Sequence, residues 1–189
     1  TRAVIEAGAL GDCGAGNDPG TPLAAVAIPA TLHDSLMARL DRLNLVKHVA
    51  QTAACIGRDF SHELLAAVVD LPDEQLLGAL DQLVATQLVF RRGTPPAAEY
   101  SFKHALVRDS AYWSLLGGRR QAIHARIAVA LEKQLPGLVA GRPEIVAHHC
   151  SEGGLIEKAV AHWHRAGRQA MLRSAMVEAL AQLNHGLDL

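Results

Sequence analysis

The sequence predicts a mainly α-helical protein that carries one small β-hairpin. Ala and Leu are abundant and aromatic residues make up only 4% of the chain, a composition that favours helix over sheet. Apolar residues recur at helical spacing over most of the sequence, and only residues 87–102 have the pattern of strand, turn and strand. Half of the 189 residues are hydrophobic, which is enough for the core of one domain or of two small ones.

The charge balance and the cysteines limit the function classes. Eighteen basic and nineteen acidic residues leave a net charge of −1, which argues against strong nonspecific attraction to nucleic acid or to an anionic membrane. The three cysteines, Cys13, Cys55 and Cys150, are too few and too far apart for a disulfide framework. No apolar run has transmembrane length and no signal peptide is recognisable, so we expect a cytoplasmic location.

The first thirty residues have two different compositions. Residues 2–10 have the pattern of the middle of an Ala-rich helix. We therefore expect the chain to be a piece of a longer protein. Residues 11–30 are rich in Gly, Ala and Pro and contain no Lys or Arg. This composition predicts a flexible linker.

Four helices are predicted after the linker. Thr31 with Asp34 fits a capping box, and leucines recur at helical spacing up to residue 43. A second helix is expected at 46–56, ending at Gly57, and a third from the capping residue Ser61 to about Val69. Pro72 opens the fourth, with Asp73 and Glu74 in its first turn, where acidic side chains suit the helix dipole.

A hairpin follows the fourth helix. Residues 87–92 are expected to form one strand, 93–96 a turn and 99–102 a returning antiparallel strand. The second, third and fourth helices followed by a hairpin have the element order of a winged helix. The sequence therefore predicts a winged-helix domain over residues 31–116.

The rest of the chain is predicted to be helical. We expect a helix at 105–116 that ends at Gly117 and Gly118, then helices at 120–135, 143–150, 155–170 and 174–187. The last two carry small residues at packing positions and together have about the length of one tetratricopeptide-type hairpin. Residues 117–189 are therefore expected to form a region of tetratricopeptide-like α-hairpins.

A winged helix raises the alternative of a DNA-binding transcriptional regulator. The helix in the recognition position, near residues 73–83, has three acidic residues and no Lys or Arg. Phosphate contacts need positive charge, and Arg91 and Arg92 on the wing are too few to supply it. We therefore expect a winged helix that packs against protein, and we do not expect nucleic acid as a partner.

Neither a metal site nor a catalytic site is predicted. His148, His149 and Cys150 are adjacent, and His162 and His164 follow, but side chains one or two apart on a helix diverge. We expect these residues to serve polar helix faces and helix–helix hydrogen bonds instead of zinc. The chain has no Gly-x-Ser-x-Gly elbow and no phosphate-binding loop of the Gly-x-x-x-x-Gly-Lys-Ser/Thr type.

The strongest candidate for a functional site is the joint between the second hairpin strand and the next helix. His104 stands at this joint beside Lys103, with Arg108 four residues further on. A histidine in this place could donate a hydrogen bond to a phosphate oxygen. It could also simply cap or support the corner, and from the residues alone this structural role is favoured.

Three phrases of the sequence resemble a known family. Residues 28–43, 53–60 and 102–109 are similar to the corresponding phrases of bacterial signal-transduction ATPases of the STAND class. The resemblance is greatest to the large proteins that carry a class III adenylate/guanylate cyclase domain ahead of the ATPase, and regulators of the MalT and LuxR type are more distant. The match covers nearly the whole chain, and its motifs are packing phrases without catalytic residues.

The resemblance implies an order of cyclase or other effector, P-loop ATPase, winged helix and tetratricopeptide-like repeats. Residues 1–10 would then continue the last helix of the ATPase. The domain that binds ATP or ADP with Mg²⁺ would lie upstream, and this segment would hold no cofactor of its own. Its partners would be that ATPase domain of the same chain and proteins bound through the repeats, without a membrane.

The resemblance also implies a role for the joint. Immune receptors of the same class carry a Met-His-Asp motif at the end of the winged helix, and its histidine contacts bound ADP. Carried over, His104 takes the nucleotide-sensing place, with Lys103 beside it facing the phosphates. Lys103 stands where Met is usual and Ala105 where Asp is usual. A plain protein-interaction scaffold without a switch is the other alternative.

Overall fold

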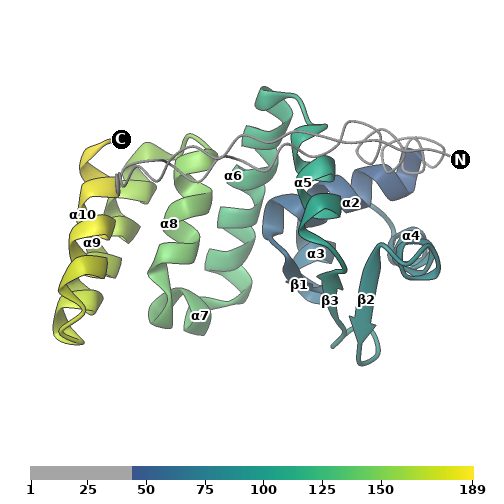
Figure 1. Ribbon diagram of the computed structural model, residues 1–189, viewed down its shortest axis with the longest axis horizontal. Coiled ribbons are helices and arrows are strands. Elements are labelled where there is room, and N and C mark those ends of the chain that lie inside the picture. Colours follow the sequence, from purple (N-terminus) through teal and green to yellow (C-terminus); the bar gives the residue numbers. More distant parts are fainter. Residues whose placement is uncertain (1–43) are drawn as a thin grey trace, which may run out of the picture.

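The computed structural model describes residues 44–189. Within this part of the chain, nine helices and three short strands make a mainly helical, elongated molecule (Figure 1). The first unit consists of α2 (Asn44–Ile56), β1 (Asp59–Ser61), α3 (His62–Val68), α4 (Asp73–Ala85), β2 (Val89–Arg92), β3 (Glu99–Phe102) and α5 (Ala105–Trp113). A row of helices follows: α6 (Gly117–Gln134), α7 (Pro136–Gly141), α8 (Pro143–Glu152), α9 (Ile156–Leu172) and α10 (Met176–Leu187).

Three expectations fall outside the described residues. They are the continuation of an upstream helix at 1–10, the linker at 11–30 and the capped helix at 31–43, and Cys13 lies there too. Among the described helices, none is both long enough and apolar enough to cross a bilayer.

The sheet has one strand more than the hairpin that the sequence predicts. β2 and β3 pair antiparallel, with Arg91 opposite Tyr100, which confirms the hairpin. β1 pairs with the other edge of β3, with Phe60 opposite Tyr100, so the strand order is β1-β3-β2. The sequence did not predict β1 because it has only three residues, too few to show an alternating pattern.

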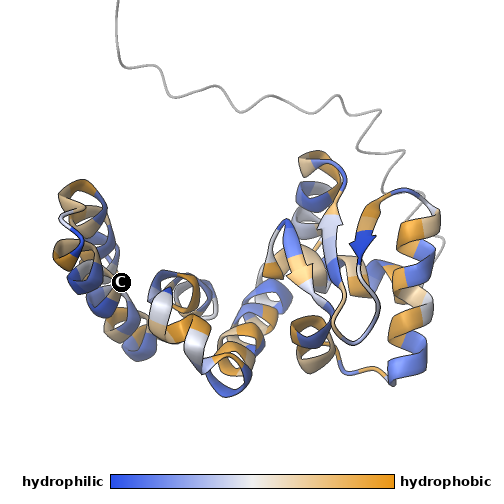
Figure 2. Cartoon of the chain, turned by 90° about the horizontal axis from the view of Figure 1, so that it is seen from below, coloured by the Kyte–Doolittle hydropathy of each residue, from blue (hydrophilic) through white to orange (hydrophobic). Residues whose placement is uncertain are grey.

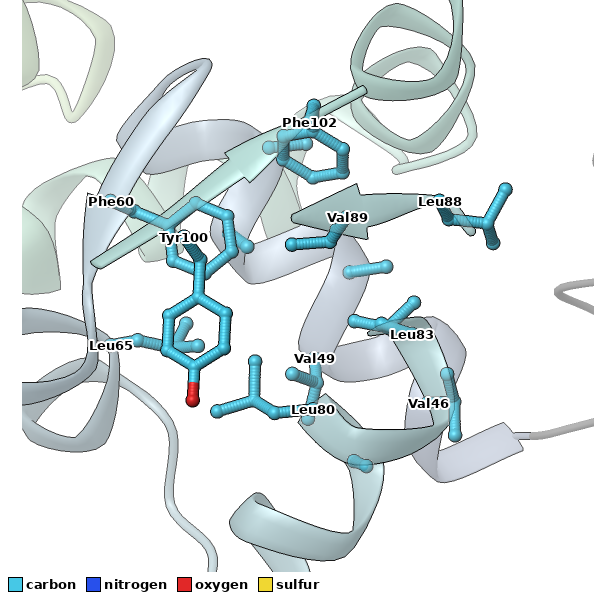
Figure 3. Close-up of a cluster of buried hydrophobic side chains, with 14 of the residues drawn as sticks. Val46, Val49, Phe60, Leu65, Leu80, Leu83, Leu88, Val89, Tyr100 and Phe102 are labelled. Carbon is cyan, nitrogen blue, oxygen red and sulfur yellow. The ribbon is translucent and has the colours of Figure 1, made fainter. Parts of the chain in front are cut away.

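The first core is built around α2, which packs against α4, α5 and α6. Figure 3 shows how the inward side chains of the sheet meet those of α2, α3 and α4. Phe60 and Tyr100 stack with their ring centroids 5.5 Å apart, on top of Leu65 and Leu80. This core holds the hairpin, and with it the start of α5, in a fixed position, because interiors packed at this density have few alternative arrangements.

The second core lies between α3 and the helical row. It includes the buried residues Val68, Ile127, Leu131, Val146 and Cys150. α6, α8, α9 and α10 each pack against the next helix, and Figure 2 shows them as a curved row that leads away from the sheet. The two cores share partly buried neighbours, Ile56 and Tyr112, so the first unit and the row are in direct contact.

One predicted helix boundary is wrong. Gly117 and Gly118 do not end a helix; they are the first two residues of α6, and α5 ends earlier, at Trp113. Neither glycine has a left-handed backbone, and the first turn of a helix tolerates Gly because its N–H groups have no intrahelical partner. α7, between Pro136 and Gly141, was not predicted.

Candidate functional site

His104 is the residue at which β3 gives way to α5. Its backbone is extended, with φ −133° and ψ 139°, and its carbonyl oxygen accepts the first hydrogen bond of the helix, from the N–H of Val107 at 3.1 Å. This makes His104 the N-cap residue, but its side chain makes no capping bond. The first N–H groups of α5 therefore have no side-chain acceptor.

The imidazole of His104 is exposed. Within the described residues no hydrogen bond, ion pair or ring contact holds it. A purely structural histidine at such a corner is expected to cap the helix or fill the core, because an ordered polar group needs a partner that offsets the lost side-chain entropy. The corner therefore presents a free imidazole together with the positive end of a helix dipole.

Lys103 is held more firmly than its neighbour. Its Nζ donates to Oε1 of Gln87 at 2.7 Å and lies 5.0 Å from the ring centroid of Phe90. Gln87 itself has a left-handed backbone, with φ +62°, at the turn between α4 and β2. The ammonium thus lies against the hairpin with its charge unpaired by any carboxylate of the described residues.

Arg108 does not join this corner. Its Nε lies 3.5 Å from the carbonyl oxygen of Ala54 on α2, and its Nη1 lies 3.2 Å from the carboxylate of Asp109. Its guanidinium also faces the ring of Tyr112 at 5.7 Å. Of the three basic side chains that the sequence places near the joint, Lys103 and His104 are therefore available to an external anion.

A buried histidine pair between α6 and α8 was not predicted from the sequence. The Nδ1 atoms of His124 and His149 are 2.9 Å apart, and the rings are only 1% and 3% exposed. The hydroxyl of Tyr112 lies 3.3 Å from the other ring nitrogen of His124. His124 lies three and seven residues before the buried Ile127 and Leu131 of α6, and this helical spacing is the signal in the sequence that could have located it.

Burial keeps both rings neutral. Loss of hydration, with further repulsion from His148 and Arg120, lowers the pKa of His124 to about 4. Loss of hydration, with repulsion from His124 and His148, lowers the pKa of His149 to about 3. Each neutral imidazole has one N–H, so the pair can form one internal hydrogen bond between α6 and α8.

Among the described residues, His148 lies beside this pair, and no ring contact joins His162 or His164 to it. His148 is exposed, and its ring lies edge-on to that of His124, with the centroids 5.8 Å apart. His162 contacts Glu132 on α6 at 3.1 Å, and His164 is exposed. The helix–helix hydrogen bonds that we expected are thus confirmed for His149 and His162. No metal-binding group of three is formed among the described residues.

The helix that we expected in the recognition position, α4, has an acidic exterior. Asp73, Glu74 and Asp81 are all exposed, and the helix has no basic residue. One of the two hairpin arginines, Arg91, is paired with Asp81 at 2.6 Å. This face offers negative charge, which repels a phosphate backbone.

Comparisons with known proteins give one informative match. An uncharacterized protein of Rhizobium meliloti (strain 1021) is 35% identical over 156 residues, which cover 82% of this chain. The match takes up only 15% of that relative, which is thus about 1,000 residues long, enough for several domains. No family model matches the chain, and no solved structure matches it.

Proposed function

We propose that this chain is a non-catalytic regulatory segment of a STAND-type signalling ATPase, linked to an adenylate/guanylate cyclase or another effector. It couples the nucleotide state of a P-loop ATPase domain of the same protein to an effector or a protein partner. ATP or ADP with Mg²⁺ is bound by that P-loop domain. His104 senses the phosphates, with Lys103 beside it.

The observation that carries the proposal is the exposed, unpartnered imidazole of His104 at the N-terminus of α5. A neutral or charged imidazole can donate to a phosphate oxygen, and the helix dipole favours an anion at the same place. The resemblance in sequence assigns this position to a nucleotide contact. The burial pattern leaves the position open to a neighbouring domain.

The order of the elements supports the same proposal. We interpret α2, α3 and α4 with the three-stranded sheet as a winged helix whose hairpin β2–β3 is the wing. We interpret the row from α6 to α10 as tetratricopeptide-like α-hairpins, in which each helix packs on the next. In a STAND protein these parts follow the ATPase domain and receive the signal.

The size of the relative is also consistent with a segment of a larger protein. The chain spans about 15% of the length of the curated relative that it matches. A relative of that length has room for an effector and an ATPase besides this segment. The activity of the whole protein, including cyclase activity, is part of the proposal.

The alternative of DNA recognition is disfavoured by charge. The exposed side of α4 carries Asp73, Glu74 and Asp81, and Arg91 is engaged by Asp81. Such a helix cannot release counterions from DNA, which is the main source of affinity for the duplex. A gel-shift titration at physiological salt should show no sequence-selective complex.

The proposed mechanism is a shift between two states. In the closed state His104 contacts the phosphates of ADP on the ATPase domain. ATP favours the open state, in which the contact is released and the helical row is free to transmit the signal. Each nucleotide biases the switch only by its difference in affinity for the two states.

His104→Ala in the full-length protein tests this proposal. The loss of one hydrogen bond to a charged phosphate should speed ADP release by about 10- to 100-fold. ADP release is measured with a fluorescent analogue in a stopped-flow instrument, and the output of the effector is measured without any stimulus. The matched control is His164→Ala, because His164 is also exposed but lies on α9.

An equal rate of ADP release in the wild type and the His104 variant, with unchanged basal output, would refute the sensor role. The same rate increase in the His164 variant would show that the effect does not come from the corner. The isolated 189-residue chain should show no calorimetric binding of ATP or ADP.

A further inference from the structure

A surface at the junction of α5 and α6 exposes large apolar side chains beside unpaired positive charge. Trp113 is 66% exposed and Leu116 is 82% exposed, and both precede the first turn of α6. Arg119 and Arg120 follow in that turn. We call these four residues the Trp113 patch.

Arg120 holds the patch in one conformation by stacking on two aromatic rings. Its guanidinium carbon lies 4.7 Å from the ring centroid of Trp113 and 4.8 Å from that of Tyr112. Stacking of this kind fixes the indole in one orientation although most of its surface faces solvent. The patch is therefore preorganised, and little entropy is lost when a partner covers it.

The charge of the patch is not neutralised by its surroundings. Among the described residues, no carboxylate lies within ion-pair distance of Arg119 or Arg120. Both residues also stand at the N-terminal end of α6, where the helix dipole disfavours cations. An acidic partner would relieve this unfavourable electrostatic arrangement.

Trp, Tyr and Arg are the residue types that dominate binding energy at protein interfaces. Trp113 and Leu116 are also two large exposed apolar side chains only three residues apart, and grouped exposed apolar residues mark interaction sites more often than single ones do. The chemistry of the patch thus fits an acidic protein surface that has a shallow place for an indole.

The chain itself offers such a surface on α4. Asp73, Glu74 and Asp81 are exposed on this helix, and Asp81 is paired with Arg91, so Asp73 and Glu74 are the carboxylates available to a partner. A Cβ built on Gly78 would meet no atom within 4 Å. Because residues 74, 78 and 81 lie one turn apart, Gly78 leaves a shallow dip between two carboxylates. We call Asp73, Glu74, Gly78 and Asp81 the α4 acidic face.

We propose that the Trp113 patch of one copy of this chain binds the α4 acidic face of a second copy. In this contact the indole of Trp113 lies on Gly78, and Arg119 and Arg120 pair with Glu74 and Asp73. α2 packs against both α4 and α6, so one helix connects the element that carries the α4 acidic face to the element that carries the two arginines. A contact between two different surfaces is head-to-tail and can continue into longer assemblies.

The contact is expected to be weak and sensitive to salt. The patch has four residues, well below the 20 to 30 per partner of a standard stable interface. By comparison with small transient interfaces, we expect association only at roughly micromolar concentrations or above. Its charge pairs lie at the surface, where salt screens them. This inference does not depend on the nucleotide-sensing role of His104.

Sedimentation velocity of the 189-residue chain over a range of concentrations tests the proposal. The wild type should associate at low salt, and the association should weaken at least tenfold in Arg119→Glu/Arg120→Glu and equally in Asp73→Lys/Glu74→Lys. A mixture of the two charge-reversed variants should form a one-to-one complex, because each supplies the surface that the other has lost. Trp113→Ala should also weaken association, and its circular dichroism should match the wild type because the indole is mostly exposed.

The matched control for Arg119→Glu/Arg120→Glu is Arg165→Glu/Arg168→Glu. It makes the same change in net charge, but on exposed residues of α9. It should associate as the wild type does. A wild type that stays monomeric at every concentration would overturn the proposal. So would association that survives both charge reversals, or a mixture of the two reversed variants that forms no complex.

Discussion

At the scale of single residues, the buried pair of His124 and His149 makes the strongest link between chemistry and stability. Both rings are nearly free of solvent, and their Nδ1 atoms share one hydrogen bond across two helices. An unfolded histidine has a pKa of about 6.5, well above the values in the folded chain. The unfolded state therefore binds more protons than the folded state at mildly acidic pH.

This difference predicts a loss of stability on acidification. Because the folded pKa values are lowered, the stabilisation is fully present above the unfolded pKa of about 6.5 and decreases as the pH falls toward 4. We expect the free energy of unfolding to fall by at most about 5 kcal/mol between pH 7 and pH 4.5, because each of the two lowered pKa values contributes at most about half of this fall. Urea denaturation followed by circular dichroism at several pH values measures it.

His149→Gln separates the contribution of the pair from other acid effects. The amide can still bond to His124 but does not titrate, so stability should depend less on pH, although it is lower at pH 7. The control His164→Gln removes an exposed histidine and should keep the wild-type pH dependence. Identical slopes for all three proteins would contradict the assignment.

Ser61 shows how one side chain starts a helix. Its Oγ accepts a hydrogen bond from the N–H of Leu64 at 3.2 Å, which confirms the cap that the sequence predicts. Ser61→Ala should destabilise the chain by about 1 kcal/mol, and Ser61→Asp should largely preserve stability. Thermal or urea unfolding of the three proteins gives the comparison, and equal stability of the Ala variant would mean that the cap contributes nothing.

At the scale of elements, the helical row depends on close approach at a few small residues. A Cβ on Gly153 would lie 2.7 Å from the backbone nitrogen of Ala125 on α6, and a backbone atom cannot move aside as a flexible side chain can. Gly153→Ala should therefore separate α8 from α6 and cost about 1–3 kcal/mol of stability.

Gly78→Ala is the matched control for that change. A Cβ at Gly78 meets no atom within 4 Å, and the residue lies inside α4. Its replacement should stabilise the chain by about 0.5–1 kcal/mol, because Ala favours helix over Gly. Urea midpoints that shift in the same direction for the two variants would show that close packing at Gly153 is not limiting.

The sequence predicted some elements more accurately than others. α2, α3, α4 and the hairpin have clear periodicity, caps or turn residues, and each is found where it was predicted. β1 was missed because its pairing with β3 depends on residues forty positions away, which a local pattern does not contain. The boundary at Gly117 was misplaced because glycine is as compatible with the first turn of a helix as with its end.

The sequence predicted where the candidate site lies, but not which of its side chains are exposed. The sequence places Lys103 and His104 at the end of β3, yet only the packing shows that His104 is exposed while Lys103 lies on Phe90. The aromatic stack of Arg120 could not be predicted either. This stack depends on how α5 and α6 are placed relative to each other, and their placement depends on the packing of the second core.

At the scale of the whole molecule, the unit that contains the sheet carries the corner at His104, and a row of helices extends from that unit (Figure 1). The two cores share the neighbours Ile56 and Tyr112, so the first unit and the row are in direct contact. Such an arrangement suits a segment that changes its contact with a neighbouring domain and keeps its own fold. It is the physical basis for the regulatory role that we propose.

Hydrogen exchange at the start of α5 tests that role most directly. The N–H groups of Ala105 and Leu106 lie in the first turn of the helix and have no intrahelical acceptor, so they should exchange fast unless something covers them. In the full-length protein, we predict that peptides containing these two residues exchange at least tenfold more slowly with ADP bound than with a non-hydrolysable ATP analogue. Equal exchange in the two nucleotide states would contradict the account, because the corner would then not be part of the switch.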